Sequence, residues 1–286
     1  MLAKEDKLIN LKNVNKVIND FEESIKKPIK TKNKKLYTGI DIGTAFIVLC
    51  VFDEDKRPVA GAYEFAQVVR DGMVVDYIGA CDIVRKLKNQ LEEKLGEELL
   101  IAGCAIPPGT ENIDGGAVKN VAESSGFIVE KILDEPTAAN KLLNLDNGAV
   151  VDVGGGTTGI SIIKNEKVVK VLDEPTGGTH FSLVLSGAYK IDFDKAEELK
   201  RDFKKHKEIF PVVRPVIDKI ISIIENASKD QEIDQIVLVG GTALLSGMED
   251  YIGQKTNIKT LKPSNPMFVT PIGIALSLIE DQKNGH

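Results

Sequence analysis

Apolar residues near the N-terminus recur at the spacing of an amphipathic helix. Over residues 8–25 they stand three or four positions apart, so one face of such a helix is apolar. They are Leu11, Val14, Ile18, Phe21 and Ile25. Pro28 ends the pattern, and a Lys-rich stretch leads to a strand near Leu36, so residues 1–35 form a helix and a basic linker. This helix either packs on the body of the protein or is a detachable docking peptide, and the pattern leaves both alternatives open.

The body contains an internal repeat of strands and glycine turns. The stretches "GIDIGTAFIVLCVFDEDKRPVA" at 39–60 and "VVDVGGGTTGISIIKNEKVVKV" at 150–171 both run strand, glycine turn, strand, polar turn, strand. The polar turn begins at Asp53 in the first and at Lys164 in the second, 12 residues after Asp41 and Asp152 respectively. The repeat predicts two related α/β lobes with facing glycine turns and a ligand in the cleft between them.

The remaining pattern completes each lobe with helices and strands. In the first lobe we expect helices over 84–100 and 117–127, a strand over 101–108, and a strand over 128–133 that leads into a helix through Asp134, Glu135 and Pro136. In the second lobe we expect helices over 179–190, 194–206 and 212–228, a strand that ends at Gly240 and Gly241, and a closing helix over 271–279. The expected lobes are 36–140 and 141–286, the closing helix belonging to the second.

Composition and charge narrow the function classes. The chain has 286 residues, of which 42% are apolar, enough to bury a substantial core. A net charge of −6 argues against nucleic acid as a partner. The three cysteines are widely spaced, which predicts reduced thiols in the core. The three histidines are scattered, so they do not form a zinc-binding cluster. Neither a membrane span nor a signal peptide is evident in the sequence. We therefore expect a soluble cytoplasmic protein.

The glycine turn of the second lobe has the chemistry of a phosphate site. Gly154, Gly155 and Gly156 lack side chains, so their backbone N–H groups can approach an anionic oxygen, and the hydroxyls of Thr157 and Thr158 lie beside them. Asp152 places a carboxylate inside an apolar strand, where its natural partner beside a phosphate is hydrated Mg²⁺. The alternative is a hairpin turn that uses glycines only for positive φ angles.

Five motifs in this order resemble those of the superfamily of actin, hexokinase and heat-shock chaperone ATPases. The motifs are "DIGT" at 41–44, "DEPTAA" at 134–139, "DVGGGTT" at 152–158, "VLVGGTALLSGM" at 237–248 and "TPIGIAL" at 270–276. The stretches "GGTHF" at 177–181 and "AEELK" at 196–200 resemble its bacterial actin and chaperone members. The resemblance implies a two-lobed actin-like ATPase with duplicated ribonuclease H-like lobes and an N-terminal helical extension.

The resemblance also implies the cofactors ATP and Mg²⁺ and a role for each motif. Asp41 and Asp152 would hold Mg²⁺ largely through water, and Glu135 would orient the attacking water, although a charge at a helix N-terminus is the alternative for Glu135. Glu197 and Lys200 would contact the nucleoside, the alternative being a solvated helix face. The residues assigned to the nucleotide are Gly43, Thr44, Gly154, Gly155, Gly156, Thr157, Thr158, Gly177, Gly178, Glu197, Lys200, Gly240, Gly241 and Thr242.

Departures from the chaperone pattern limit the expected activity. No lysine in 60–100 matches the one that chaperones place near the γ-phosphate, so we expect slow hydrolysis. Ala243 and the two leucines after it stand where chaperones place an arginine against adenine, so the resemblance does not specify the base. Little chain follows the closing helix, so contact with a client protein is expected to use the ATPase body or the N-terminal helix.

Longer phrases resemble the chaperone-like proteins of bacterial ethanolamine utilisation. They include "PPGT" at 107–110, "VVDVGGGTTGISIIK" at 150–164, "GGTHFSL" at 177–183 and "MFVTPIGIA" at 267–275. The resemblance implies an accessory factor for the ethanolamine microcompartment or its cobalamin-dependent ethanolamine ammonia-lyase. The alternatives are a filament-forming bacterial actin homologue and a small-metabolite kinase. The sequence does not determine the client or the oligomeric state.

Overall fold

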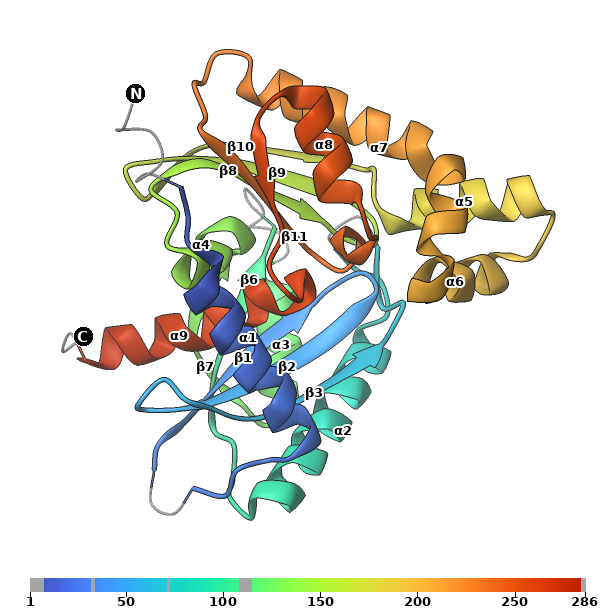
Figure 1. The fold of residues 1–286 in the computed structure, drawn as a ribbon. Coiled ribbons are helices and arrows are strands. Elements are labelled where there is room, and N and C mark those ends of the chain that lie inside the picture. The colour runs from blue at the N-terminus through green and yellow to red at the C-terminus, as the bar shows by residue number, and fades with distance from the viewer. Residues whose placement is uncertain (1–7, 32–33, 71–72, 108–114, 284–286) are drawn as a thin grey trace. The chain divides into compact units, whose positions relative to one another are not determined.

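The structure is a computed structural model that describes residues 8–31, 34–70, 73–107 and 115–283 (Figure 1). The chain divides into two compact units. The first comprises Ile9–Asn144 together with the C-terminal segment from Phe268, and the second comprises Leu145–Met267. Each unit contains one five-stranded sheet. Residues 108–110 of the "PPGT" phrase lie outside the described residues.

The sheet of the first unit joins an antiparallel hairpin region to a parallel one. Its strand order is β3-β2-β1-β6-β7, in which β2 and β3 run antiparallel and β6 and β7 run parallel to their neighbours. The bounds are β1 Leu36–Ile42, β2 Phe46–Asp53, β3 Pro58–Phe65, β6 Ile101–Ile106 and β7 Ile128–Asp134. A short separate ribbon, β4 (Val69–Arg70) and β5 (Met73–Val74), follows β3.

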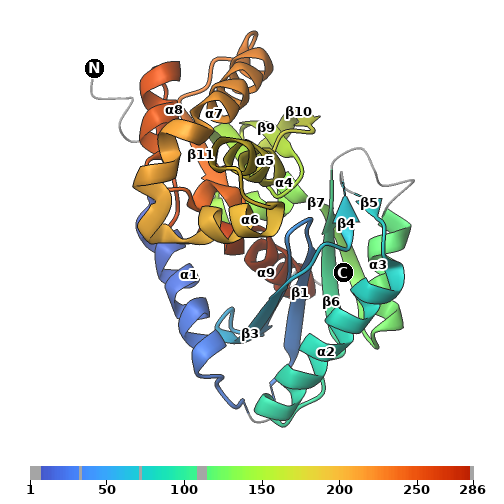
Figure 2. The ribbon, with the colours of Figure 1, turned by 90° about the vertical axis from the view of Figure 1, so that its right-hand side faces the viewer.

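Helices cover both faces of this sheet because alternate residues of its strands are apolar on either side. Ile40 packs in a cluster with residues of α2 (Tyr77–Leu95) and α3 (Gly115–Ser124). A side chain at the neighbouring Gly39 would point to the other face, where its β-carbon would lie 3.3 Å from the Ala275 side chain of α9 (Val269–Lys283). Figure 2 shows α1 (Leu11–Lys26) and α2 on opposite sides of the sheet.

The N-terminal helix α1 is part of the core of the first unit. Val14, Ile18 and Phe21 are buried, and the Phe21 ring lies 5.1 Å from that of Phe268 and 6.3 Å from that of Phe52. In the linker, Lys34 pairs with Asp53 at 2.8 Å and anchors the chain before β1. The structure therefore favours the packed alternative over the detachable peptide.

The C-terminal helix α9 packs in the first unit, whereas the sequence boundary of 141–286 counted it with the second. It crosses α4 (Glu135–Leu143) so closely that a β-carbon at Gly273 would lie 1.8 Å from the carbonyl oxygen of Ala138. Glu280 of the same helix pairs with Lys141 at 3.1 Å and with Lys56 at 2.9 Å. Position along the chain does not reveal this packing, because the helix returns to the first sheet after the second sheet is complete.

The sheet of the second unit repeats the order of the first. Its order β10-β9-β8-β11-β12 matches β3-β2-β1-β6-β7 strand for strand. The bounds are β8 Asn147–Val153, β9 Thr158–Lys164, β10 Lys167–Glu174, β11 Gln235–Val239 and β12 Lys259–Leu261. Val153 pairs with Thr158 as Ile42 pairs with Ile47, so the offset of 111 positions between the two aspartates holds through both hairpins. The predicted duplicated α/β architecture is confirmed.

The second unit has helices near the predicted ranges 179–190, 194–206 and 212–228, of which the second ends at Arg201 and not at 206, and one further helix after β11. They are α5 Gly178–Tyr189, α6 Phe193–Arg201, α7 His206–Ser228 and α8 Met248–Thr256. The prediction for α7 was wrong at its start, because the helix begins at His206 and contains Pro211 and Pro215. Asp202 separates α6 from α7, since its side chain accepts from Lys204 N at 3.0 Å and caps a short 3₁₀ turn, Phe203–Lys205.

The three cysteines are buried free thiols, as the sequence predicts. Burial, followed by the charge of Asp41, raises the pKa of Cys50 well above its usual value and that of Cys104 to about 12. Within the described ranges, no helix combines the length and the apolar character that crossing a membrane requires.

Candidate functional site

The β8–β9 turn of the second unit is the centre of the candidate site. Its first residue, Gly154, donates from N to Thr157 O at 3.0 Å, which closes the turn around Gly155 and Gly156. Thr158 is fully buried, and its hydroxyl donates to Thr176 O at 2.5 Å, so this side chain fixes the turn instead of lining its surface. Thr157 remains partly exposed beside the glycines.

The carbonyl groups of this turn are held by neighbouring segments. Gly154 O accepts from Gly178 N at 2.9 Å and from Thr242 Oγ1 at 2.7 Å. Gly155 O accepts from Thr179 N at 2.8 Å and from Thr179 Oγ1 at 3.0 Å. The start of α5 and the 3₁₀ turn after β11 (Thr242–Leu244) therefore fix both peptide planes.

The orientation of these peptides leaves two N–H groups facing away from the protein segments that hold them. In a trans peptide the C=O of one residue and the N–H of the next point in opposite directions. Since the carbonyls of Gly154 and Gly155 point to α5 and Thr242, the N–H groups of Gly155 and Gly156 point the other way. Among the described residues, neither N–H group has a backbone acceptor. Two fixed donors of this kind fit an anionic oxygen.

Thr242→Val should weaken this arrangement without collapsing it. The substitution keeps the side-chain shape but removes the hydroxyl that donates to Gly154 O, which still accepts from Gly178 N. We expect the free energy of unfolding to fall by about 1 kcal/mol in urea denaturation. Thr260→Val is the matched control, because the Thr260 hydroxyl donates at 3.1 Å to Ile258 O, two residues away and outside the glycine turn. Equal stability of T242V and the wild-type protein would contradict the expectation.

A buried ion pair lies against the same turn. Lys200 Nζ lies 2.6 Å from Glu197 Oε2 and 3.0 Å from Gly178 O, and Ser182 Oγ donates to Glu197 Oε2 at 2.6 Å. Burial lowers the pKa of Lys200, and the Glu197 carboxylate opposes this shift. The alternative of a solvated helix face is thus wrong for these two side chains. A β-carbon at Gly178 would lie 2.9 Å from Lys200 Nζ, so a larger residue there would displace the ammonium group.

Asp152 lies near the end of β8, beside the turn that follows β11. Burial, and then the charge of Asp173, raises its pKa to about 6. Gly240 has a φ of 88°, and a β-carbon there would lie 2.2 Å from Asp152 Oδ1, so only glycine both adopts this backbone and leaves room for the carboxylate. Gly241 follows it and is partly exposed.

The donor set suits a metal held mainly through water. Within the described ranges, no group of three or more His, Cys, Asp or Glu side chains could hold a metal ion. Mg²⁺ keeps several of its waters and needs only one or two carboxylates beside phosphate oxygens. A partly buried carboxylate with a raised pKa, on the strand that leads to two N–H groups without a backbone acceptor, therefore fits Mg²⁺ with a phosphate group.

The first unit contains a matching turn with different side chains. Gly43 N donates to Phe46 O at 2.9 Å, as Gly154 N does to Thr157 O. Asp41 stands on β1 where Asp152 stands on β8. Thr44, however, is equivalent to Gly155, so the two turns use their threonines at different positions.

Glu135 begins α4 directly after β7, as the sequence predicts. Asp134 caps this helix, with Oδ1 accepting from Thr137 N at 2.9 Å, and Pro136 occupies the first turn. Glu135 itself is partly buried. The structure thus gathers the residues assigned to the second lobe around one turn, and it places Asp41, Gly43, Thr44 and Glu135 at strand ends of the first unit.

Several residues of the site were not identified from the sequence. Ser182 and Thr179 hydrogen-bond to Glu197 and Gly155, and Arg201 Nε lies 3.7 Å from Glu197 Oε1. His206 was noted only as one of three scattered histidines. Arg201 follows the "AEELK" stretch directly, and this position in the sequence could have indicated that it lies near Glu197.

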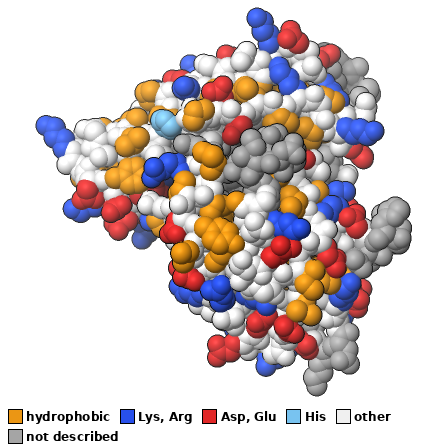
Figure 3. Space-filling view, turned by 180° about the vertical axis from the view of Figure 1, so that it is seen from behind, with side chains coloured by type: hydrophobic (Ala, Val, Ile, Leu, Met, Phe, Trp, Pro, Cys, Tyr) orange, Lys and Arg blue, Asp and Glu red, His pale blue; other side chains and the backbone are white. Residues whose placement is uncertain are grey.

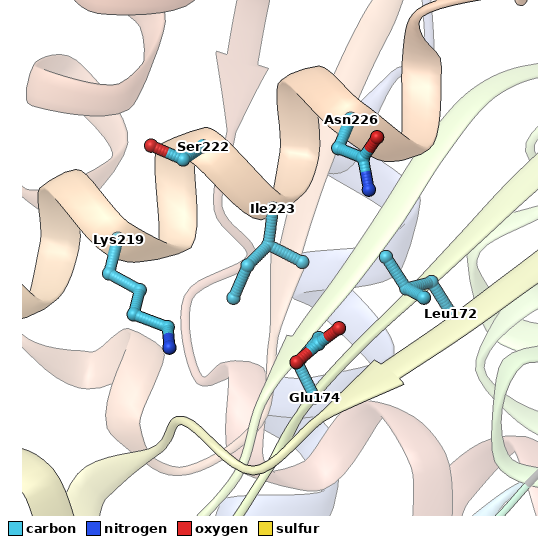
Figure 4. A pocket seen from close by; sticks show the side chains of 6 residues that line it. All are labelled: Leu172, Glu174, Lys219, Ser222, Ile223 and Asn226. Atoms are coloured by element: carbon cyan, nitrogen blue, oxygen red, sulfur yellow. The ribbon is translucent and has the colours of Figure 1, made fainter.

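A separate hollow of about 400 Å³ lies between β10 and α7 (Figure 4). Leu172 and Glu174 come from β10, and Lys219, Ser222, Ile223 and Asn226 from α7. None of them belongs to the glycine turn or its supports, so we do not assign the nucleotide to this hollow. On the face drawn in Figure 3, acidic and basic side chains are interspersed.

Comparison with known proteins identifies the family. The ethanolamine utilization protein EutJ of Salmonella typhimurium is 42% identical over 243 residues, which cover 85% of this chain and 85% of that protein. The EutJ of Escherichia coli K12 is equally similar, over 85% of this chain and 86% of that protein. The chain belongs to the EutJ family. The crystal structure of EutJ from Carboxydothermus hydrogenoformans has a TM-score of 0.89 and 44% identity, and covers 93% of this chain and 99% of that one.

More distant matches establish the wider fold of this EutJ family member. The MreB/Mbl protein family model matches residues 60–186, and the model of the type IV pilus assembly protein PilM matches 134–272. The structure of MreB5 of Spiroplasma citri bound to AMPPNP has a TM-score of 0.72 and 17% identity, and covers 88% of this chain and 99% of that one. The fold is that of the actin-like ATPases, as the five motifs imply.

Proposed function

We propose that this protein binds ATP with Mg²⁺, hydrolyses it slowly, and acts in the cytoplasm as a chaperone-like assembly or reactivation factor for ethanolamine utilisation. The observation that carries nucleotide binding is the β8–β9 turn, whose held carbonyls leave the N–H groups of Gly155 and Gly156 as free donors. Membership of the EutJ family supports the pathway. Its client would be the microcompartment or its ethanolamine ammonia-lyase.

Each part of the site has a distinct role in this proposal. Gly155, Gly156, Thr157 and Thr44 bind phosphate oxygens through backbone N–H and hydroxyl groups, in turns that Gly154 and Gly43 close with their own N–H groups. Glu197, Lys200 and the 240–242 turn contact the nucleoside, and Glu135 orients the attacking water. Asp41 and Asp152 would hold Mg²⁺ through its waters, and the ion, when bound, would offset the negative charge of the phosphates.

Thermal unfolding with and without Mg-ATP tests nucleotide binding. At a hundred times the dissociation constant, bound ligand adds about 2.7 kcal/mol to the free energy of unfolding, which raises Tm by about 5 °C. ATP with EDTA should give a smaller shift, because the carboxylates then face the phosphates without an ion. The absence of a shift at millimolar Mg-ATP would contradict the proposal.

Co-purification with ethanolamine ammonia-lyase tests the chaperone role. The full chain should be used, since α1 contributes Phe21 to the core of the first unit and its removal would destabilise the protein. We expect retention of the lyase to differ between ATP and ADP, because nucleotide state changes partner affinity in a switch of this kind. Equal retention with ATP, with ADP and without nucleotide would contradict this role.

A further inference from the structure

His206 joins two segments that support the nucleoside side of the site. It is the first residue of α7 and is only 3% exposed. Its Nε2 lies 3.1 Å from Lys200 O at the end of α6, and its Nδ1 lies 3.0 Å from both the N and the Oγ of Ser246. Both ring nitrogens therefore bond outside α7, one to each segment.

The hydrogen bonds fix the protonation state of this ring. The backbone N–H of Ser246 can only donate, so Nδ1 accepts and carries no proton. The proton must then be on Nε2, which donates to Lys200 O. Burial keeps the ring neutral by lowering the pKa of His206, and the charge of Lys262 acts in the same direction. Both nitrogens are used to hold other segments, which leaves neither for proton transfer.

The two segments held by His206 carry the side chains assigned to the nucleoside. Lys200 ends the α6 stretch that contains Glu197, and Ser246 ends the turn that begins at Gly240 and contains Thr242. We propose that His206 is a positioning residue that sets the spacing of these two segments and thereby controls nucleoside affinity. The inference rests on the proposed nucleotide binding. Among the described residues, the phosphate turn is linked to these segments only through Thr242, because Gly178 and Thr179 supply three of the four hydrogen bonds that hold its carbonyls, and we therefore expect little effect on phosphate binding.

The test compares ATP with Mg-tripolyphosphate, which lacks a nucleoside, by titration calorimetry on the full chain. H206L removes the hydrogen bonds of both ring nitrogens, and we expect its dissociation constant for ATP to rise about tenfold to a hundredfold, while that for tripolyphosphate stays within about twofold. H206N places an amide oxygen where Nδ1 stands, so it should recover part of the ATP affinity. Ser228→Ala, at the other end of α7, is the matched control, because Ser228 Oγ bonds only to carbonyls of its own helix.

The outcomes separate this inference from the proposed function. If the wild-type protein binds no ATP, the proposed function fails and the inference falls with it. If the wild-type protein binds ATP but H206L binds it equally well, or loses ATP and tripolyphosphate to the same degree, only the positioning role is overturned. Should H206L fail to fold, the H206N variant tests the positioning role, because asparagine in this position lacks the donor to Lys200 O. Its ATP affinity should fall about threefold to tenfold, and unchanged affinity would overturn the role.

Discussion

Gly273→Ala is expected to lower the free energy of unfolding of the first unit by more than about 4 kcal/mol. A β-carbon at this position would lie 1.8 Å from Ala138 O and 2.7 Å from Ala138 C. Both atoms belong to the backbone of α4, so no side-chain rotation can relieve the overlap. Helix α9 would have to move away from α4, which would also separate Ala275 from β1.

Urea unfolding followed by circular dichroism measures this effect. Gly187→Ala is the matched control, because Gly187 also lies within a helix, α5, but a β-carbon there would meet no atom within 4 Å. Alanine is the better helix former, so the control should be neutral or more stable by up to about 1 kcal/mol. A G273A protein as stable as the wild type would show that α9 and α4 can separate at little cost.

Asp152→Asn is expected to abolish stabilisation by Mg-ATP and to make the ligand-free protein more stable at pH 7. The pKa of this carboxyl is raised to about 6 in the folded protein, above the value of about 4 in an unfolded chain. The wild-type protein therefore loses stability from this group as pH rises from about 4 to 6. Two pKa units correspond to at most about 2.7 kcal/mol, and because Asp152 keeps some solvent contact we expect a gain of about 1–2 kcal/mol.

The pH dependence separates this effect from a general change in packing. At pH 4 the wild-type carboxyl is protonated in the folded state, so D152N and the wild type should differ by less than they do at pH 7. Asp250→Asn, on the exposed side of α8, is the control and should change neither stability nor the response to Mg-ATP. If D152N keeps the full thermal shift with Mg-ATP, Asp152 is not part of the nucleotide site.

The sequence was sufficient for the features that depend on local pattern. The two hairpins, their glycine turns and the offset between Asp41 and Asp152 follow from alternating apolar residues and from glycines at the ends of strands, and the structure reproduces this register. The strand-to-helix turn at Glu135 was also predicted, because an acidic cap followed by proline defines a helix start.

Features that depend on packing between distant segments were not predictable in this way. The placement of α9 requires the contact of Gly273 with Ala138, which are far apart in the sequence. The bond from Ser182 to Glu197 and the role of His206 depend on how α5, α6 and α7 meet. A single sequence records the polar side chain but not its partner, so these residues resembled ordinary surface residues until the helices were placed.

The burial of Cys50, Cys81 and Cys104 has a practical consequence for spectroscopy of this protein. Maleimide dyes react with exposed thiolates, and the raised pKa values of Cys50 and Cys104 keep those two sulfurs protonated and unreactive at neutral pH. A single cysteine introduced on the surface of either unit would therefore take up a fluorophore selectively without removal of the native thiols. Labels placed in pairs would allow energy transfer to test whether nucleotide changes the distance between them.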